Sequence, residues 1–314
     1  MIKKLIKVLS IIFLIVILSV IYLSIIGIKT EKFNDDIKNR ISDINYNIKL
    51  NLEDIKFLLN PINFTANITT KNPTIILGNN ELKLKSIKTN ISLKSLIFDQ
   101  FSVDELEIST KSIMLNDIIL LARSFKNSTE LFLLDRVIKD GFLVADIRLK
   151  FDNKGRVKEN YQIKGFIKSG KLNFLNHLNV KNLNLNFDIR KNKYSLTKLD
   201  SEINDVKFSS PLIEIHEKEN LFMVKGKIST SEKDFSKDQI NITSFNFMKN
   251  LNIEKARFSS ENDISFNISK KLKFKNLNIE SKINLDQLVI INNFIDLKSY
   301  LPNLDKVINF ENHK

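Results

Sequence analysis

The chain's three histidines are the residues best suited to metal or acid–base chemistry, and their spacing favours neither. His177, His216 and His313 lie far apart, and none has a second histidine at the helical spacing of a zinc motif. The chain contains no cysteine, and therefore no thiolate that could act as a nucleophile or bind a metal. We predict no metal site and no cofactor.

The acidic residues do not supply a catalytic arrangement either. Asp35, Asp36 and Asp135 lie on predicted polar helix faces, without a basic or nucleophilic partner in a motif. The sequence has no Gly-x-Ser-x-Gly and no glycine-rich phosphate loop. We interpret these carboxylates as solvated, and we predict a protein that is not an enzyme.

An uncharged apolar run from Val8 to Ile28 is the strongest signal in the sequence. At about 1.5 Å per residue, a helix of this length reaches about 30 Å, the thickness of a bilayer's hydrocarbon core. A cleaved signal peptide is the alternative, but its apolar region is shorter and ends at a small-x-small site. The run instead continues into Lys29. We predict that residues 8–28 are an uncleaved membrane anchor.

Lysines on both sides of this run bear on its orientation. Lys3, Lys4 and Lys7 precede it, and positive charge beside a first apolar segment tends to remain in the cytoplasm. Lys29, Lys32 and Lys38 on the other side reduce the asymmetry. We expect residues 1–7 in the cytoplasm and the bulk of the chain across the membrane. The absence of cysteine fits an oxidising compartment.

The composition indicates a folded chain with a solvated basic face. Hydrophobic residues make up 43% of the chain, which is too apolar for disorder. The net charge is +13, but the basic residues occupy the polar positions of alternating segments. We expect no nucleic-acid partner. A mild attraction to anionic lipid headgroups is the functional alternative to simple solvation.

From residue 46 onward, apolar and polar residues alternate with a period of two, which is typical of half-buried β-strands. Asn, Asp, Gly and Pro residues separate the alternating segments and predict turns. We expect the apolar positions to line one face of a sheet. The candidate residues for this face are Ile147, Leu149, Phe151, Leu183, Leu185, Phe187, Ile189, Phe266 and Ile268.

Three segments depart from this period and predict helices. They are a juxtamembrane helix over residues 29–45, a helical insertion over about 113–138, and a closing helix over about 293–310 that is broken at Pro302. The insertion either closes one end of the sheet or is an ordinary packing element.

A sheet with one apolar face must bury that face, and these few helices are not enough to cover it. Either the sheet folds on itself as a sandwich or barrel, or it curves into a trough whose apolar face meets acyl chains. The anchor favours the trough. We predict a mainly β fold in which a transmembrane helix precedes one long, curved antiparallel sheet, with residues 46–314 as a single domain.

An open sheet also leaves strand edges unpaired, and such edges invite another chain. We expect a partner protein or a second copy to dock on the strand around Ile283 to Leu285, or on the segment after it.

The order of these segments resembles the AsmA-like envelope proteins. After the anchor, an early strand ends in Ser95-Leu96, and the next carries a hydrophobic-x-x-Leu-x-Ile pattern at Val103, Leu106 and Ile108. The resemblance extends from Leu5 to Ile228. The segments 163–172, 182–187, 209–215 and 222–226 are similar to the repeated middle region of the larger, YhdP-like members.

This resemblance implies a bridge-like lipid-transfer protein of the YhdP and TamB type. Such a protein is anchored in the bacterial inner membrane and offers a periplasmic β-groove along which phospholipid moves between the inner and outer membranes. Because neighbouring strands are about 4.8 Å apart, the roughly fourteen predicted strands make a sheet only about 65 Å long, shorter than an envelope-spanning groove. We therefore expect a short or partial member. The alternative is a non-enzymatic envelope scaffold or assembly factor with a dry β-core.

Overall fold

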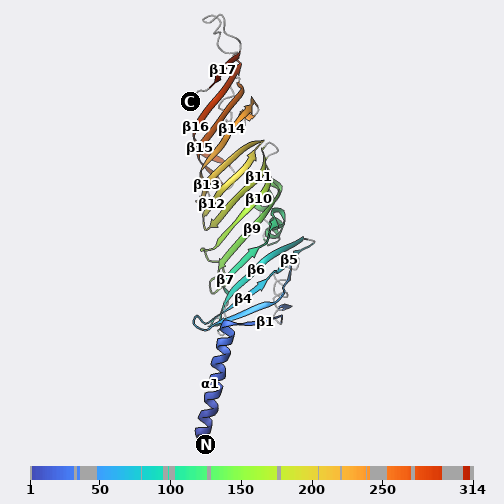
Figure 1. The fold of residues 1–314 in the computed structure, drawn as a ribbon, viewed down its shortest axis with the longest axis vertical. Coiled ribbons are helices and arrows are strands. Elements are labelled where there is room, and N and C mark those ends of the chain that lie inside the picture. The colour runs from blue at the N-terminus through green and yellow to red at the C-terminus, as the bar shows by residue number, and fades with distance from the viewer. Residues whose placement is uncertain are drawn as a thin grey trace, which may run out of the picture. The chain divides into compact units, whose positions relative to one another are not determined.

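The computed structural model describes residues 2–31, 34–35, 48–78, 80–94, 98, 103–125, 129–174, 178–203, 205–219, 221–237, 239–240, 253–269, 273–291 and 307–311 (Figure 1). These residues form an N-terminal helix, two short helices and 17 strands that belong to one antiparallel sheet. The described pairings do not close this sheet into a barrel. The predicted mainly β fold, with an apolar helix before a long antiparallel sheet, is therefore confirmed.

The chain divides into two compact units. Unit 1 contains residues 1–167 and 187–191, and unit 2 contains residues 168–186 and 192–314. The sequence pattern predicts a single domain over residues 46–314. The boundary between the units crosses the strands β10 (Gln162–Phe174) and β11 (Leu178–Arg190) and does not follow a loop. The sequence therefore contains no linker that would indicate this division.

Helix α1 spans Ile2–Ile25, and its residues 6–25 are long and apolar enough to cross a membrane. The helix ends where Gly27 adopts a φ of 73° and the N–H groups of Ile26 and Gly27 donate to the carbonyl of Tyr22. A side chain at Gly27 would meet the carbonyl oxygen of Phe57. The predicted anchor extends to Ile28, but the helix ends at Ile25, and Ile28 begins a strand in which it pairs with Phe57.

The strands that lie wholly in unit 1 are β1 (Ile28–Thr30), β2 (Ile48–Asn51), β3 (Ile55–Asn60), β4 (Thr65–Lys71), β5 (Thr74–Leu77), β6 (Asn80–Ser92), β7 (Val103–Thr110), β8 (Ile113–Met114) and β9 (Ile138–Lys150). Antiparallel pairing joins β1, β3, β4, β6, β7 and β9 in that order. Strand β5 pairs with β2 and β6, and β8 pairs with β9.

Helices α4 (Leu115–Phe125) and α5 (Thr129–Val137) lie within the predicted insertion at 113–138. Ile118 and Leu121 of α4 pack against a buried cluster of Leu82, Leu84 and Ile113. In unit 1, the insertion therefore contributes to an ordinary hydrophobic core.

Each terminal helix prediction conflicts with a strand in the structure, although residues 34–35 of the first are helical as predicted. Lys29 and Thr30 pair with Lys56 and Ile55 of β3 in place of starting a juxtamembrane helix. Strand β17 (Val307–Glu311) pairs with β16 (Phe274–Ile291), although the sequence predicts a closing helix up to residue 310. Apart from residues 31 and 34–35, the rest of the first prediction lies outside the described residues, as do residues 292–306 of the second.

The strands that lie wholly in unit 2 are β12 (Lys193–Ile203), β13 (Val206–Lys218), β14 (Leu221–Ser236), β15 (Ile253–Ser269), β16 and β17. Each pairs antiparallel with the next along the chain, yellow-green to red in Figure 1. Asp205 and Glu219 take positive φ values of 66° and 50° in the short turns on either side of β13. Unit 2 is thus a meander of long strands.

Candidate functional site

The register of unit 2 sorts its side chains onto two chemically different faces. Tyr194 lies opposite Ile215, Ile215 opposite Val224, and Val224 opposite Phe266. Directly opposed residues project from the same side of an antiparallel pair. This side is the apolar face. We call the part of the apolar face around Tyr194, Ile215, Val224 and Phe266 the open segment. Its residues are Tyr194, Leu196, Ile213, Ile215, Phe222, Val224, Ile264, Phe266 and Ile268.

The opposite side is the charged face, and ion pairs cover it. The guanidinium of Arg257 donates twice to the carboxylate of Asp234, at 2.9 and 3.1 Å. Lys193 contacts Glu214 at 3.0 Å. A hydrogen bond from Lys193 and the charge of its ammonium group lower the pKa of Glu214. Such a face belongs in water.

One end of the apolar face is a dry hydrophobic core. Val206, Phe235, Ile253 and Ala256 are buried together with Ile240, which lies outside the strands and covers them. The ring of Phe235 stacks on that of Phe258, also on this face, with their centroids 4.1 Å apart. This end has no room for a ligand.

A row of polar side chains, three of them hydrogen-bonded to one another, crosses the apolar face beside this core. The hydroxyl groups of Thr230 and Ser260 lie 2.9 Å apart, and Asn262 donates to Ser260 Oγ at 3.0 Å. Ser210 is 2% exposed, and its Oγ has no hydrogen-bond partner among the described residues. We call these four residues the polar belt. It separates the dry core from the open segment.

The open segment is only half-buried. Val224 is buried, but the other side chains of the segment keep part of their surface accessible. The described elements that lie wholly in unit 2 are all strands, so they provide no second layer over this segment. Burying a large apolar side chain stabilises a protein by about 1.5–3 kcal/mol. Incompletely buried apolar side chains gathered on one face therefore form a favourable site for an apolar ligand.

Four of the residues predicted to line the apolar face belong to unit 2. Phe266 and Ile268 are half-buried members of the open segment. Leu183 and Leu185 on β11 are buried. The side chain of Asn182, the residue before Leu183, donates to Glu202 on the charged face, so Leu183 and Leu185 project to the apolar side.

The other predicted residues belong to unit 1. Ile147 and Leu149 of β9 are half-buried and lie opposite Ile108 and Leu106 of β7. Phe151 follows β9 and makes an isolated bridge with Val157. The remaining two, Phe187 and Ile189 on β11, are also half-buried.

Phe187 lies over a glycine of the neighbouring strand. Its Cζ would be 2.7 Å from a Cβ placed on Gly165. The next residue, Asp188, points to the opposite side, where it accepts hydrogen bonds from Gln162 and Arg190. Partial burial raises the pKa of Asp188, but these hydrogen bonds and the charge of Lys164 outweigh it and leave the pKa below its usual value. The alternation predicted for β11 is therefore present in the fold.

Neither the polar belt nor the contribution of β12 to β14 to the open segment was predicted from the sequence. Ser210, Thr230 and Ser260 occupy positions where the strand pattern calls for apolar residues, and this mismatch was the available signal. The contribution of Tyr194 and Phe222 depends on which strands pair, and periodicity alone does not specify pairing.

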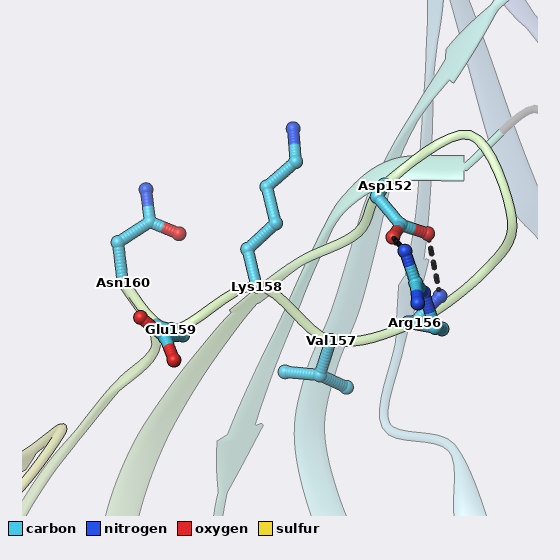
Figure 2. Close-up of a pocket in the computed structure, with 6 residues that line it drawn as sticks. All are labelled: Asp152, Arg156, Val157, Lys158, Glu159 and Asn160. Carbon is cyan, nitrogen blue, oxygen red and sulfur yellow. Dashed lines mark hydrogen bonds and ion pairs between the residues drawn. The ribbon is translucent and has the colours of Figure 1, made fainter.

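A hollow in unit 1, lined by residues 152 and 156–160, lies in the connection after β9 (Figure 2). Asp152 accepts the backbone N–H groups of Lys154 and Arg156 and the Nε–H of Arg156. These interactions, chiefly the hydrogen bond from the Arg156 backbone, lower the pKa of Asp152. Glu159 forms an ion pair with Lys191. The charged groups of this hollow thus stabilise a turn.

The potential metal ligands are dispersed where the structure describes them. His216 lies on the charged face opposite Lys193 and Met223. His177 and His313 lie outside the described residues. Among the residues that are described, no three His, Asp or Glu side chains form a group that could hold a metal ion.

Comparisons of the chain with protein-family models, with curated proteins and with solved structures find no match. The assignment to the AsmA-like proteins therefore stays a proposal.

Proposed function

We propose that this chain is a membrane-anchored protein whose open segment binds the acyl chains of phospholipids. The observation that carries the proposal is the contrast between two faces of the same strands. Half-buried aliphatic and aromatic side chains line one face, and ion pairs cover the other.

Acyl chains match the open segment because the hydrophobic effect needs no directional partner. A chain lying along Ile215, Val224 and Phe266 would remove the remaining apolar surface from water. The phospholipid headgroup would stay in water or meet the many lysines. Helix α1 supports this choice of ligand, since a membrane-spanning segment keeps the protein beside a reservoir of phospholipid.

The proposed location is the bacterial inner membrane, with the N-terminus in the cytoplasm and the strands in the periplasm. Lys3, Lys4 and Lys7 before the apolar run support this orientation. The resemblance to AsmA-like proteins supports a role in phospholipid transport toward the outer membrane and in outer-membrane homeostasis.

The second candidate function is an envelope scaffold or assembly factor without a lipid ligand. The dry core around Val206 and Phe235 favours it, because that part of the same face is already filled by the protein itself. The two functions differ in what covers the open segment in the cell: phospholipid in the first, protein in the second.

Neighbouring residues on β14 provide the test. A photoreactive amino acid is placed at Phe222, on the apolar face, or at Met223, on the opposite face and 36% exposed. After irradiation of native membranes containing the full chain, mass spectrometry identifies the adducts. We expect phospholipid adducts at Phe222 and none at Met223.

The Met223 probe is the matched control, because it sits on the same strand and replaces another apolar side chain. Phe266 and Asn267 offer a second pair of opposite parity should the Phe222 variant fail to fold. Equal lipid capture at both positions of a pair would contradict the proposal. Exclusive capture of protein by the Phe222 or Phe266 probe would support the scaffold.

A further inference from the structure

Strand β16 has a long edge without a strand partner among the described residues. One edge pairs with β15 along nearly its whole length. On the other edge, β17 pairs only with Gln287 to Ile291. The preceding residues, Asn278 to Asp286, thus have backbone groups on that edge that no described strand uses. The edge also carries Ile283, whose side chain is 48% exposed.

Two charges on this edge lack a counter-ion within the described part of the chain. Glu280 lies directly opposite Asp263 of β15, which is a like charge, and Lys282 lies opposite Glu261. Lys227 contacts both Glu261 and Asp263, at 3.8 and 3.9 Å. No described ion pair includes Glu280 or Lys282. The edge therefore presents an acid and a base, two residues apart and on the same face.

We propose that this edge of β16 pairs antiparallel with the same edge of a second copy of the chain, about a two-fold axis through Ser281. In this register, Ser281 of one copy lies opposite Ser281 of the second copy. Glu280 faces Lys282 of the second copy, and Lys282 faces Glu280 of that copy. One step further out, Ile279 faces Ile283 of the second copy. Asn278 faces Asn284 of that copy, which ends the regular run.

The charge pattern is the reason for choosing a second copy as the occupant. A two-fold interface requires a surface complementary to itself, and the run from Asn278 to Asn284 meets this condition on both faces. Opposite charges meet on the charged face, and isoleucines meet on the apolar face. Pairs of both kinds stabilise antiparallel strands. This pairing goes beyond the proposed lipid binding and does not depend on it.

Disulfide trapping tests the register directly, because the chain contains no cysteine. Opposed residues of an antiparallel pair have Cα atoms about 4.5–5.5 Å apart, within reach of a disulfide. Ser281→Cys in the full-length chain in membranes should give a covalent homodimer on mild oxidation. Ser281 is exposed, so the substitution leaves the fold unchanged.

Asn278→Cys is the matched control on the same edge. In the proposed register, the two copies of residue 278 are six positions apart, or about 20 Å, too far for a disulfide. We expect about ten-fold more dimer from Ser281→Cys than from Asn278→Cys alone. Mixing Asn278→Cys chains with differently tagged Asn284→Cys chains should restore the cross-link. Failure of Ser281→Cys to cross-link, or equal yields from both single variants, would overturn the proposal.

Charge exchange provides an independent test. Glu280→Lys or Lys282→Glu alone should reduce the Ser281→Cys dimer several-fold, because like charges then face each other across the axis. The combined Glu280→Lys and Lys282→Glu exchange should restore it. A double exchange that stays as low as the single variants, or a Ser281→Cys adduct with a different protein, would also overturn pairing between copies.

Discussion

Individual residues of the charged face hold the exposed side of unit 2 together. Asp234 accepts two hydrogen bonds from Arg257 and lies 3.5 Å from Lys255. The hydrogen bonds from Arg257 are the main cause of the lowered pKa of Asp234, and the charges of Arg257 and Lys255 add to it. The stabilising effect of this carboxylate is complete above its unfolded pKa and disappears as the pH falls through its lower folded pKa.

We therefore expect Asp234→Asn to lower the melting temperature slightly at neutral pH. Below the folded pKa of Asp234, the variant and the wild type should have the same melting temperature. Thermal unfolding followed by circular dichroism at several pH values measures this difference. Asp200→Asn is the control, because Asp200 is exposed on the same face and has no described ion pair. A difference between Asp234→Asn and wild type that does not change with pH would contradict this role.

The polar belt is the part of the candidate site that the sequence of a single strand does not predict. A serine in a strand reads as solvent-facing, yet Ser210 and Ser260 are buried on the apolar face. What places them there is the register with neighbouring strands, since Ser260 lies opposite Thr230. Sequence periodicity does not contain that long-range pairing.

At the scale of elements, the packing of strand β10 against its neighbours requires a glycine at position 165. A Cβ on Gly165 would lie 2.1 Å from the carbonyl oxygen of Val144 and 2.7 Å from Phe187 Cζ. A backbone oxygen cannot move aside without disturbing β9. We expect Gly165→Ala to destabilise the intact protein by about 1–3 kcal/mol, measured as a lower midpoint of chemical denaturation.

Gly226→Ala supplies a graded comparison in another strand. There the nearest atom to a new Cβ is Ile213 Cγ1 at 2.9 Å, a side-chain atom that can rotate away, although the Leu212 carbonyl oxygen lies at 3.0 Å. Its effect should be smaller than that of Gly165→Ala. The reverse order would show that the close packing of β10 is not what limits stability.

Elements with many alternating residues could be predicted, and short ones at the ends could not. The pattern of Leu183 to Ile189 is long enough to define a strand and its two faces, and the spacing within residues 115–125 defines α4. The stretches at residues 28–30 and 307–311 are too short to show a clear period. They become strands because β3 and β16 are available to pair with them.

At the scale of the whole molecule, the mainly β fold follows from the sequence pattern, since alternating segments greatly outnumber helical ones. The choice of an open sheet over a sandwich or barrel came from the anchor and not from the strand pattern. The division into two compact units does not follow, because it lies within β10 and β11 and leaves no trace of a linker in the sequence. The proposed function likewise depends on something that no strand pattern contains, namely the side of the membrane on which the strands lie.

The three lysines before the apolar run of α1 predict that side. A reporter active only in the cytoplasm, fused after Lys314, should be inactive if the chain beyond α1 is periplasmic. Replacing Lys3, Lys4 and Lys7 with glutamine leaves Lys29 and Lys32 as the basic residues nearest the apolar run, and reporter activity should then rise as part of the population inverts. Activity from the unmodified fusion would place the open segment in the cytoplasm. That result would exclude transport across the periplasm, but acyl-chain capture at Phe222 would remain testable, because it depends on the apolar face and not on the compartment.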